Sequence, residues 1–123
     1  MEIFLVEDSV PIRERLAAML GGIPGATLVG EAADADAAIR EILATRPDIV
    51  VLDLGLAGGT SGFDVLRAVR PLAPEIDFYM LSNYAADPYR QLAERLGACD
   101  FFDKSRELGR ARQLIAQRAA GKQ

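Results

Sequence analysis

Short apolar runs alternate with longer segments of helical periodicity along the whole chain. Each apolar run has the length of a buried strand, and the segment after it repeats its apolar residues every three or four positions. The expected strands are residues 3–6, 26–32, 49–52, 77–81 and 99–102. Because strands that alternate with helices form parallel sheets covered by those helices, the pattern predicts an α/β fold.

Capping and helix-breaking residues mark the ends of the expected helices. Asp34 can cap the second helix, and Pro47 prevents its continuation. Ser61 and Asp64 have capping-box spacing before the third helix. The helices are expected from an Asp8 or Ser9 cap to Leu20, between Asp34 and Pro47, from Ser61 through Arg70, from Asp87 to Leu96, and from Leu108 into the alanine-rich end of the chain.

Acidic residues stand at the ends of two expected strands. Glu7 and Asp8 follow the first strand, and Asp53 follows the third. If these strands are neighbours in one parallel sheet, three carboxylates meet at its carboxyl edge, where open α/β folds bind ligands. Mg²⁺ prefers oxygen ligands of this kind. The cluster predicts a Mg²⁺ site made by Asp8, Asp53 and a backbone carbonyl near Gly55, with Glu7 acting through water.

Other polar residues suit a phosphoryl group at the same edge. Ser82 follows the fourth expected strand and Lys104 follows the fifth. A carboxylate such as Asp53 attacks phosphorus only when the phosphoryl group is neutralised and aligned, which a metal and a lysine can do. Taken singly, Ser82 would be a helix cap, Lys104 an exposed lysine and Phe101 a core aromatic. Glu7 and Asp8 could likewise cap the first helix.

Length and charge bound the class of protein. A chain of 123 residues is long enough for one domain with a real core, and we expect a single domain over residues 1–123. The 14 basic and 18 acidic side chains give a net charge of -4, which argues against direct binding of nucleic acid. No apolar run approaches the about 20 residues that span a bilayer, and Glu2 does not suit a signal peptide, so we expect a cytoplasmic protein.

Two amino acids are informative through their scarcity. The sequence contains no histidine, which excludes histidine-based zinc sites and catalytic triads, and any phosphohistidine must therefore come from another molecule. Cys99 is the single cysteine, so an internal disulfide is excluded. Because Cys99 adjoins an apolar strand, we expect a small packed residue and not a reactive thiol.

Taken together, the site residues closely resemble those of the receiver domain of two-component response regulators. The residues that carry the resemblance, in the family's order, are Glu7, Asp8, Asp53, Gly62, Ser82, Phe101 and Lys104. The segment Phe101–Ser105 is most similar to receivers of the LuxR/NarL-like branch, which often carry a helix-turn-helix output domain. The resemblance implies a flavodoxin-like (βα)5 fold, with a parallel sheet of strand order 2-1-3-4-5 and helices on both faces.

The resemblance also implies a role for each residue. Asp53 would accept a phosphoryl group from a sensor histidine kinase or a histidine phosphotransfer protein, with Mg²⁺ held by the three acids. Lys104 would pair with the phosphoryl group, Ser82 would bind it, and Phe101 would move inward when Ser82 does. The surface of the fourth helix, fifth strand and fifth helix would then engage a downstream protein, an output domain or a second copy.

The chain is therefore expected to be a signalling switch that catalyses only its own phosphorylation and dephosphorylation. One alternative is a receiver fragment of a longer DNA-binding transcriptional regulator. Another is an aspartyl-phosphate phosphatase or phosphotransferase, although Gly55 stands where haloacid-dehalogenase-like enzymes have a second acid. A flavin or nucleotide binder is disfavoured because Glu7 and Asp8 would repel phosphate. A pseudo-receiver that only docks to a partner is disfavoured by the intact acids and Lys104.

Overall fold

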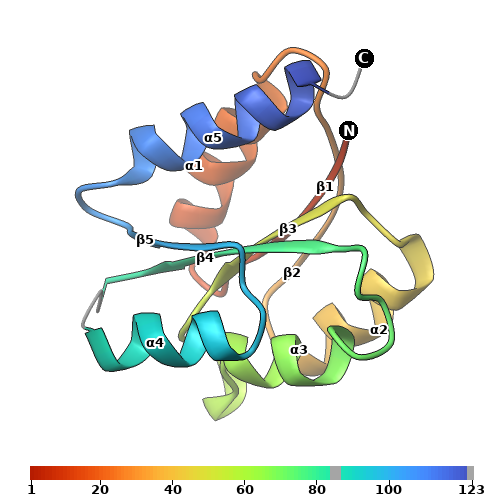
Figure 1. Ribbon diagram of the computed structural model, residues 1–123, viewed down its shortest axis with the longest axis vertical. Coiled ribbons are helices and arrows are strands. Elements are labelled where there is room, and N and C mark those ends of the chain that lie inside the picture. The colour runs from red at the N-terminus through yellow and green to blue at the C-terminus, as the bar shows by residue number, and fades with distance from the viewer. Residues whose placement is uncertain (84–86, 122–123) are drawn as a thin grey trace.

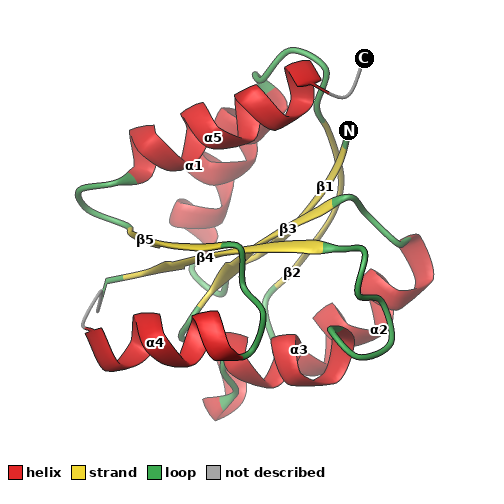
Figure 2. Cartoon of the chain, viewed as in Figure 1, coloured by secondary structure: helices red, strands yellow, loops and turns green. Residues whose placement is uncertain are grey.

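Strands and helices alternate along the chain, as the hydrophobic pattern predicts (Figures 1 and 2). The computed structural model describes residues 1–83 and 87–121. The elements are β1 (Glu2–Val6), α1 (Val10–Gly21), β2 (Thr27–Ala32), α2 (Ala35–Thr45), β3 (Ile49–Asp53), the 3-10 helix η1 (Ala57–Gly59), α3 (Gly62–Val69), β4 (Asp77–Ser82), α4 (Asp87–Arg95), β5 (Asp100–Asp103) and α5 (Leu108–Gly121). The expected strand ends are within about one residue of these bounds.

The strands form one parallel sheet in the order β2-β1-β3-β4-β5, which confirms the expected flavodoxin-like topology. Helices α1 and α5 cover one face of the sheet, and α2, α3 and α4 cover the other (Figure 1). In the described part of the chain, no helix has the length and apolar character needed to cross a membrane. Strand order places the carboxyl ends of β1 and β3 side by side, with Val6 opposite Leu52.

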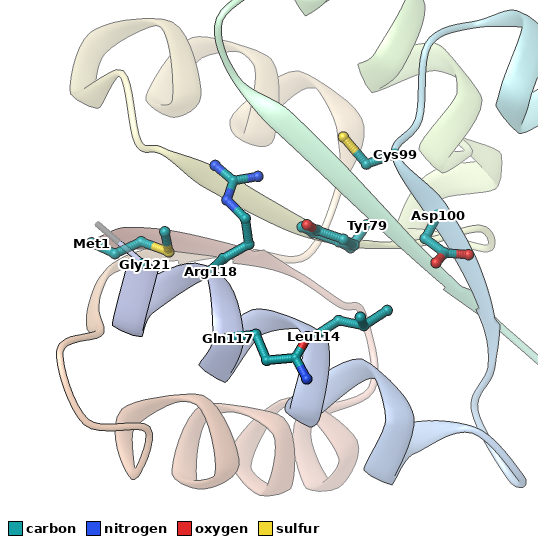
Figure 3. A pocket seen from close by; sticks show the side chains of 8 residues that line it. All are labelled: Met1, Tyr79, Cys99, Asp100, Leu114, Gln117, Arg118 and Gly121. Carbon is teal, nitrogen blue, oxygen red and sulfur yellow. The ribbon is translucent and has the colours of Figure 1, made fainter. Parts of the chain in front are cut away.

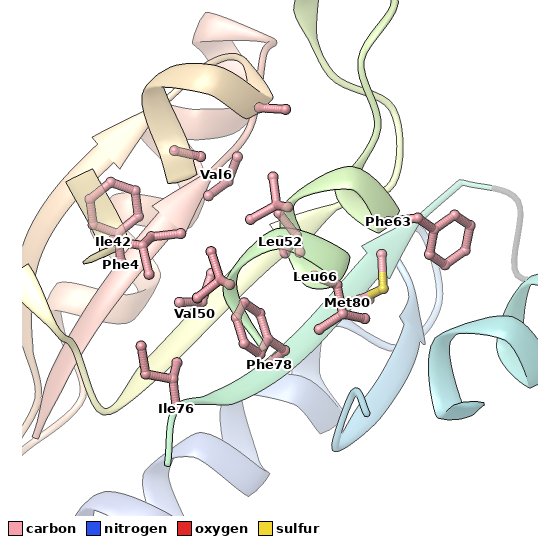
Figure 4. Close-up of a cluster of buried hydrophobic side chains, with 14 of the residues drawn as sticks. Phe4, Val6, Ile42, Val50, Leu52, Phe63, Leu66, Ile76, Phe78 and Met80 are labelled. Carbon is pink, nitrogen blue, oxygen red and sulfur yellow. The ribbon is translucent and has the colours of Figure 1, made fainter. Parts of the chain in front are cut away.

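The sheet separates two hydrophobic clusters. Alternate strand residues such as Phe4, Val50 and Phe78 pack with α2 and α3, where Ile42 and Leu66 complete the cluster (Figure 4). The intervening strand residues pack with α1 and α5 on the opposite face. Central strand β3 is covered on both faces and buried along its whole length, which explains its continuous apolar run.

The end of β3 is held close to the start of α3. Ser61 caps α3 by accepting from the Phe63 N–H at 3.0 Å, and the Asp64 carboxylate accepts from the Ser61 N–H at 2.9 Å, so the capping box is confirmed. The Gly62 N–H donates to the Leu54 carbonyl at 2.8 Å. A Cβ at Gly62 would lie 2.3 Å from the Asp53 carbonyl oxygen. Glycine is therefore required for α3 to fold back against the end of β3.

Candidate functional site

Three carboxylates meet at the carboxyl edge of the sheet, as predicted. Glu7 and Asp8 follow β1, Asp53 ends β3, and one oxygen from each lies within 4.8 Å of the others. Glu7 and Asp53 are buried, with exposed fractions of 1% and 8%, whereas Asp8 is exposed. Their convergence follows from the pairing of β1 with β3. Buried like charges of this kind require compensating cations.

Lys104 supplies one such cation. Its ammonium forms an ion pair with Glu7 and a second one with Asp53, where Nζ lies 2.9 Å from Oδ2. Burial alone would lower the pKa of Lys104, but hydrogen bonds and charge attraction from Glu7 and Asp53 outweigh this effect and raise the pKa. The lysine therefore stays protonated at neutral pH. Three carboxylates share this single ammonium, which leaves negative charge for a further cation to neutralise.

Glu7 is fixed in place by its own contacts. Its carboxylate Oε2 accepts from the Ser9 N–H at 3.1 Å, and its carbonyl oxygen accepts from Arg13 Nη1 at 2.9 Å. Asp8 is instead exposed, and the pKa of its carboxyl is raised, first by desolvation and then by the neighbouring Glu7. A cation would relieve this destabilisation of ionised Asp8, so Asp8 is better placed than Glu7 for direct ligation.

The candidate residues border one cavity of about 400 Å³. Glu7, Asp8, Asp53, Gly55, Ser82 and Lys104 are among its lining residues. Ser82 is 1% exposed at the end of β4, and the loop after β3 brings Gly55 to the wall. The structure thus brings together six of the seven predicted site residues, and Phe101 lies outside the lining. Ile12 of α1 also lines the cavity, which its helical periodicity alone did not indicate.

A tight turn after β5 positions Lys104. Asp103 Oδ1 accepts from the Ser105 hydroxyl at 2.6 Å, from the Ser105 N–H at 2.8 Å and from the Arg106 N–H at 3.2 Å. These bonds, led by the Ser105 hydroxyl, lower the pKa of the Asp103 carboxyl. The Lys104 N–H donates to the Ser82 carbonyl at 2.9 Å. The role of Asp103 in this turn was not predicted from the sequence, although an Asp two residues before a Ser is a recognisable turn signal.

Comparison with known proteins identifies the family. The family model described as "Response regulator receiver domain" matches residues 3–116. The chain belongs to this family. This receiver is 30% identical to the DNA-binding transcriptional activator DevR/DosR of Mycobacterium tuberculosis, with 98% of the chain and 59% of the relative covered. It is 32% identical to protein-glutamate methylesterase/protein-glutamine glutaminase 3 of Geobacter sulfurreducens, with 85% of the chain and 28% of the relative covered.

Solved structures agree with this assignment. A LuxR-family two-component response regulator from Aurantimonas superposes with a TM-score of 0.89 at 32% identity, covering 98% of this chain and 85% of the other. The signal receiver domain of the putative response regulator NarL from Mycobacterium tuberculosis superposes with a TM-score of 0.86 at 26% identity, covering 98% of this chain and 96% of the other. The chain spans 59% and 28% of the two curated relatives' lengths, so the receiver corresponds to only part of each of them. As a receiver, the domain serves signalling and not metabolism.

In this receiver Phe101 is already buried. The side chain is 4% exposed and belongs to the cluster shared with α3 and α4. The guanidinium carbon of Arg90 lies 5.4 Å from the centre of its ring. The resemblance to receiver domains implied an aromatic ring that moves inward upon phosphorylation. The structure shows the ring buried, and the movement itself stays a prediction.

A second cavity of about 590 Å³ lies between α5 and strands β4 and β5 (Figure 3). Its polar groups are largely satisfied within the protein: Arg118 pairs with Asp77, and Cys99 Sγ lies 3.3 Å from Asp77 Oδ1. We therefore assign no ligand to it. Cys99 is exposed and not packed, contrary to expectation, because it lies in the turn before β5. Desolvation, followed by the Asp77 carboxylate, raises the pKa of its thiol and disfavours the reactive thiolate.

Proposed function

We propose that Asp53 is the phosphoryl acceptor of this receiver. The observation that carries the proposal is the 2.9 Å contact between Lys104 Nζ and Asp53 Oδ2, in a cavity that Asp8 and Ser82 also line. A carboxylate beside a fixed ammonium is poised to receive a group whose negative oxygens the ammonium can then bind. Asp8 and Glu7 are less suited because one is exposed and the other is fixed by Ser9 and Lys104.

We propose that Glu7, Asp8, Asp53 and the backbone carbonyl of Gly55 hold a Mg²⁺ ion. The donor set consists of oxygen atoms, the carboxylates lie within 4.8 Å of one another, and their charge exceeds that of Lys104. When bound, the ion would neutralise phosphoryl oxygens and so lower the repulsion that the carboxylate meets. Asp8 would ligate directly, whereas Glu7 would act through water while it anchors Lys104.

The transfer itself is a displacement at phosphorus. An Asp53 carboxylate oxygen forms a bond to phosphorus as the bond to a histidine nitrogen breaks, and that nitrogen keeps the electron pair. Lys104 holds one phosphoryl oxygen and the Ser82 hydroxyl donates to another. Because the chain has no histidine, the phosphohistidine belongs to a partner, either a sensor histidine kinase or a histidine phosphotransfer protein. We place this exchange in the cytoplasm.

For the output we propose the surface formed by α4, β5 and α5. Ser82 pairs in register with Asp103 at the β4–β5 edge, so movement at the phosphoryl site reaches β5 directly. Phe101 would transmit the change to that surface. Its partner would be an output domain, a downstream protein or a second copy of the chain. The relative DevR/DosR is a DNA-binding transcriptional activator. We therefore propose that the receiver controls transcription as part of a longer regulator.

Treatment with acetyl phosphate and Mg²⁺ tests the acceptor. Intact-mass spectrometry should detect one added phosphoryl group, which hydroxylamine removes as expected for an acyl phosphate. Asp53→Asn should abolish the addition. Asp48→Asn is the matched control, because Asp48 precedes the same strand at its opposite end. Equal labelling of the two variants would contradict the assignment of Asp53.

A further inference from the structure

Arg90 joins three parts of the chain around the edge of the sheet. Its Nη1 donates to the Phe101 carbonyl oxygen at 2.6 Å, and its guanidinium makes a cation–π contact with the Phe101 ring. Its Nη2 donates to Glu107 Oε1 at 2.7 Å. Helix α4, which carries Arg90, lies on the opposite face of the sheet from α5, which Glu107 precedes, and β5 runs between them (Figure 1). One guanidinium therefore links α4 and the start of α5 across β5.

Glu107 carries this link to the lysine turn. The oxygen that binds Arg90, Oε1, also accepts from the Asp103 N–H at 3.0 Å. In return, the Glu107 N–H donates to the Asp103 carbonyl at 2.8 Å. Asp103 directly precedes Lys104, whose ammonium reaches Asp53. The same carboxylate oxygen thus contacts both α4 and the backbone next to the phosphoryl-site lysine.

We propose that Arg90 and Glu107 form a latch that positions both Phe101 and Lys104 for phosphoryl binding. This inference rests on the proposed function of Asp53. Arg90 lies over the ring of Phe101 and binds its carbonyl, which holds the ring in its buried position without a phosphoryl group. A ligand shifts a conformational equilibrium only through its different affinities for the two states. Because the latch already populates the binding-competent arrangement, it raises the apparent affinity for a phosphoryl group.

The contacts distinguish this latch from an ordinary surface ion pair. Arg90 and Glu107 side chains are 35% and 26% exposed, whereas the Arg46–Glu75 pair is 50% and 61% exposed. The guanidinium carbon of Arg90 also lies 5.4 Å from the centre of the Phe101 ring, a cation–π contact for which a planar guanidinium and a lysine ammonium are not interchangeable. The positive charge and the planar shape of the Arg90 guanidinium therefore make separable contributions to the contact with Phe101. Arg90→Lys keeps the charge and so tests the contribution of the planar shape.

The first measurement follows the Phe101 ring without any phosphoryl mimic. The protein is labelled with 4-fluorophenylalanine, and Phe101→Tyr assigns the fluorine resonance of Phe101 among those of the other phenylalanines. Arg90→Gln should shift and broaden this resonance, and Arg90→Lys should do so to a smaller extent. Arg95→Gln is the matched control, because Arg95 is an exposed arginine of the same helix and its loss removes the same charge. A Phe101 resonance that is unchanged in Arg90→Gln would overturn the proposal.

The second measurement is the affinity for beryllofluoride, a phosphoryl mimic, in the presence of Mg²⁺. Arg90→Gln and Glu107→Ala should each bind it roughly three- to tenfold more weakly than the parent, while Arg95→Gln binds as the parent does. Arg110→Gln is a second control, because Arg110 contacts the other oxygen of Glu107 and lies over Phe102. Parent-like affinity in Arg90→Gln, or an equal loss in Arg110→Gln, would overturn the link to phosphoryl binding. Failure of the proposed function gives a different result, because the parent protein itself would not bind beryllofluoride.

Discussion

At the scale of single residues, Lys104 decides whether the acid cluster is tolerated. Glu7 is only 1% exposed. Its ion pair with Lys104 offsets the free-energy cost of removing the Glu7 carboxylate from water. Asp53 shares the same ammonium. The residue that would bind the phosphoryl group therefore also stabilises the metal-free fold, and its substitution has consequences for both.

Lys104→Met should lower the free energy of unfolding by about 3 kcal/mol at neutral pH, because it leaves buried Glu7 without its cation. The raised pKa of Lys104 means that its contribution is fully present below the ordinary lysine value of 10.5 and is lost only as pH rises through the higher folded-state pKa. Urea denaturation measures the loss. Arg46→Met removes one partner of an exposed ion pair and should cost less than about 1 kcal/mol. Similar costs for the two variants would contradict this account.

Asp8 should have the opposite effect on the metal-free protein. Desolvation and Glu7 raise the pKa of Asp8 in the folded state, so its ionised form lowers stability above that pKa. Asp8→Asn should therefore raise the melting temperature at neutral pH, and this gain should disappear as acid protonates Asp8 in the parent. Calorimetric titration should show that the same variant binds Mg²⁺ more weakly, with parent affinity also falling in acid. Unchanged Mg²⁺ affinity in Asp8→Asn would remove Asp8 from the metal site.

At the scale of elements, the features that could be predicted from the sequence are those that depend on neighbouring residues, such as helix caps and apolar runs. The capping-box spacing of Ser61 and Asp64 predicted the start of α3, and the apolar run before Asp53 predicted the central strand. The pairing of β1 with β3 then brought the acids together. The contacts of Arg90 could not be predicted, because they join residues 11 and 17 positions away through packing across an edge strand. The buried position of the Phe101 ring depends on the same packing, which the spacing of apolar residues along the sequence does not reveal.

The tight approach of α3 to β3 predicts a contrast between two glycines. Gly62→Ala should destabilise the protein by about 1–3 kcal/mol or more, because its Cβ would meet the Asp53 carbonyl and backbone atoms cannot rotate away. Gly109 lies in α5, with nothing within 4 Å of an added Cβ. Gly109→Ala should therefore stabilise by about 0.5–1 kcal/mol. Urea denaturation of both variants provides the comparison. Equal changes in the free energy of unfolding would show that the close approach of α3 to β3 does not require glycine at position 62.

At the scale of the whole molecule, charge is unevenly distributed. Residues 88–123 carry eight Lys and Arg against four Asp and Glu, although the full chain has a net charge of -4. All three carboxylates of the acid cavity come from the remaining, acidic part of the chain. A phosphoryl group on Asp53 would carry roughly two negative charges in place of the one on the carboxylate, a net gain of about one, screened over about 8 Å in physiological salt. Charge alone therefore reaches the surface of α4, β5 and α5 weakly, and a response there requires a change of contacts.

Binding of beryllofluoride with Mg²⁺ should test whether contacts change as far away as the surface of α4, β5 and α5. We expect backbone NMR shifts at the loops after Val6, Asp53 and Leu81, which border the cavity, and also at Tyr89, Phe101 and Ala111. The distant shifts are expected because Lys104 follows the phosphoryl mimic and the turn of Asp103 is bonded to Glu107 and, through it, to Arg90. Asp53→Asn should remove both sets of shifts, since it removes the proposed acceptor. Shifts confined to the three loops would mean that Phe101 is a fixed core residue and that phosphorylation changes only the charge at the carboxyl edge of the sheet.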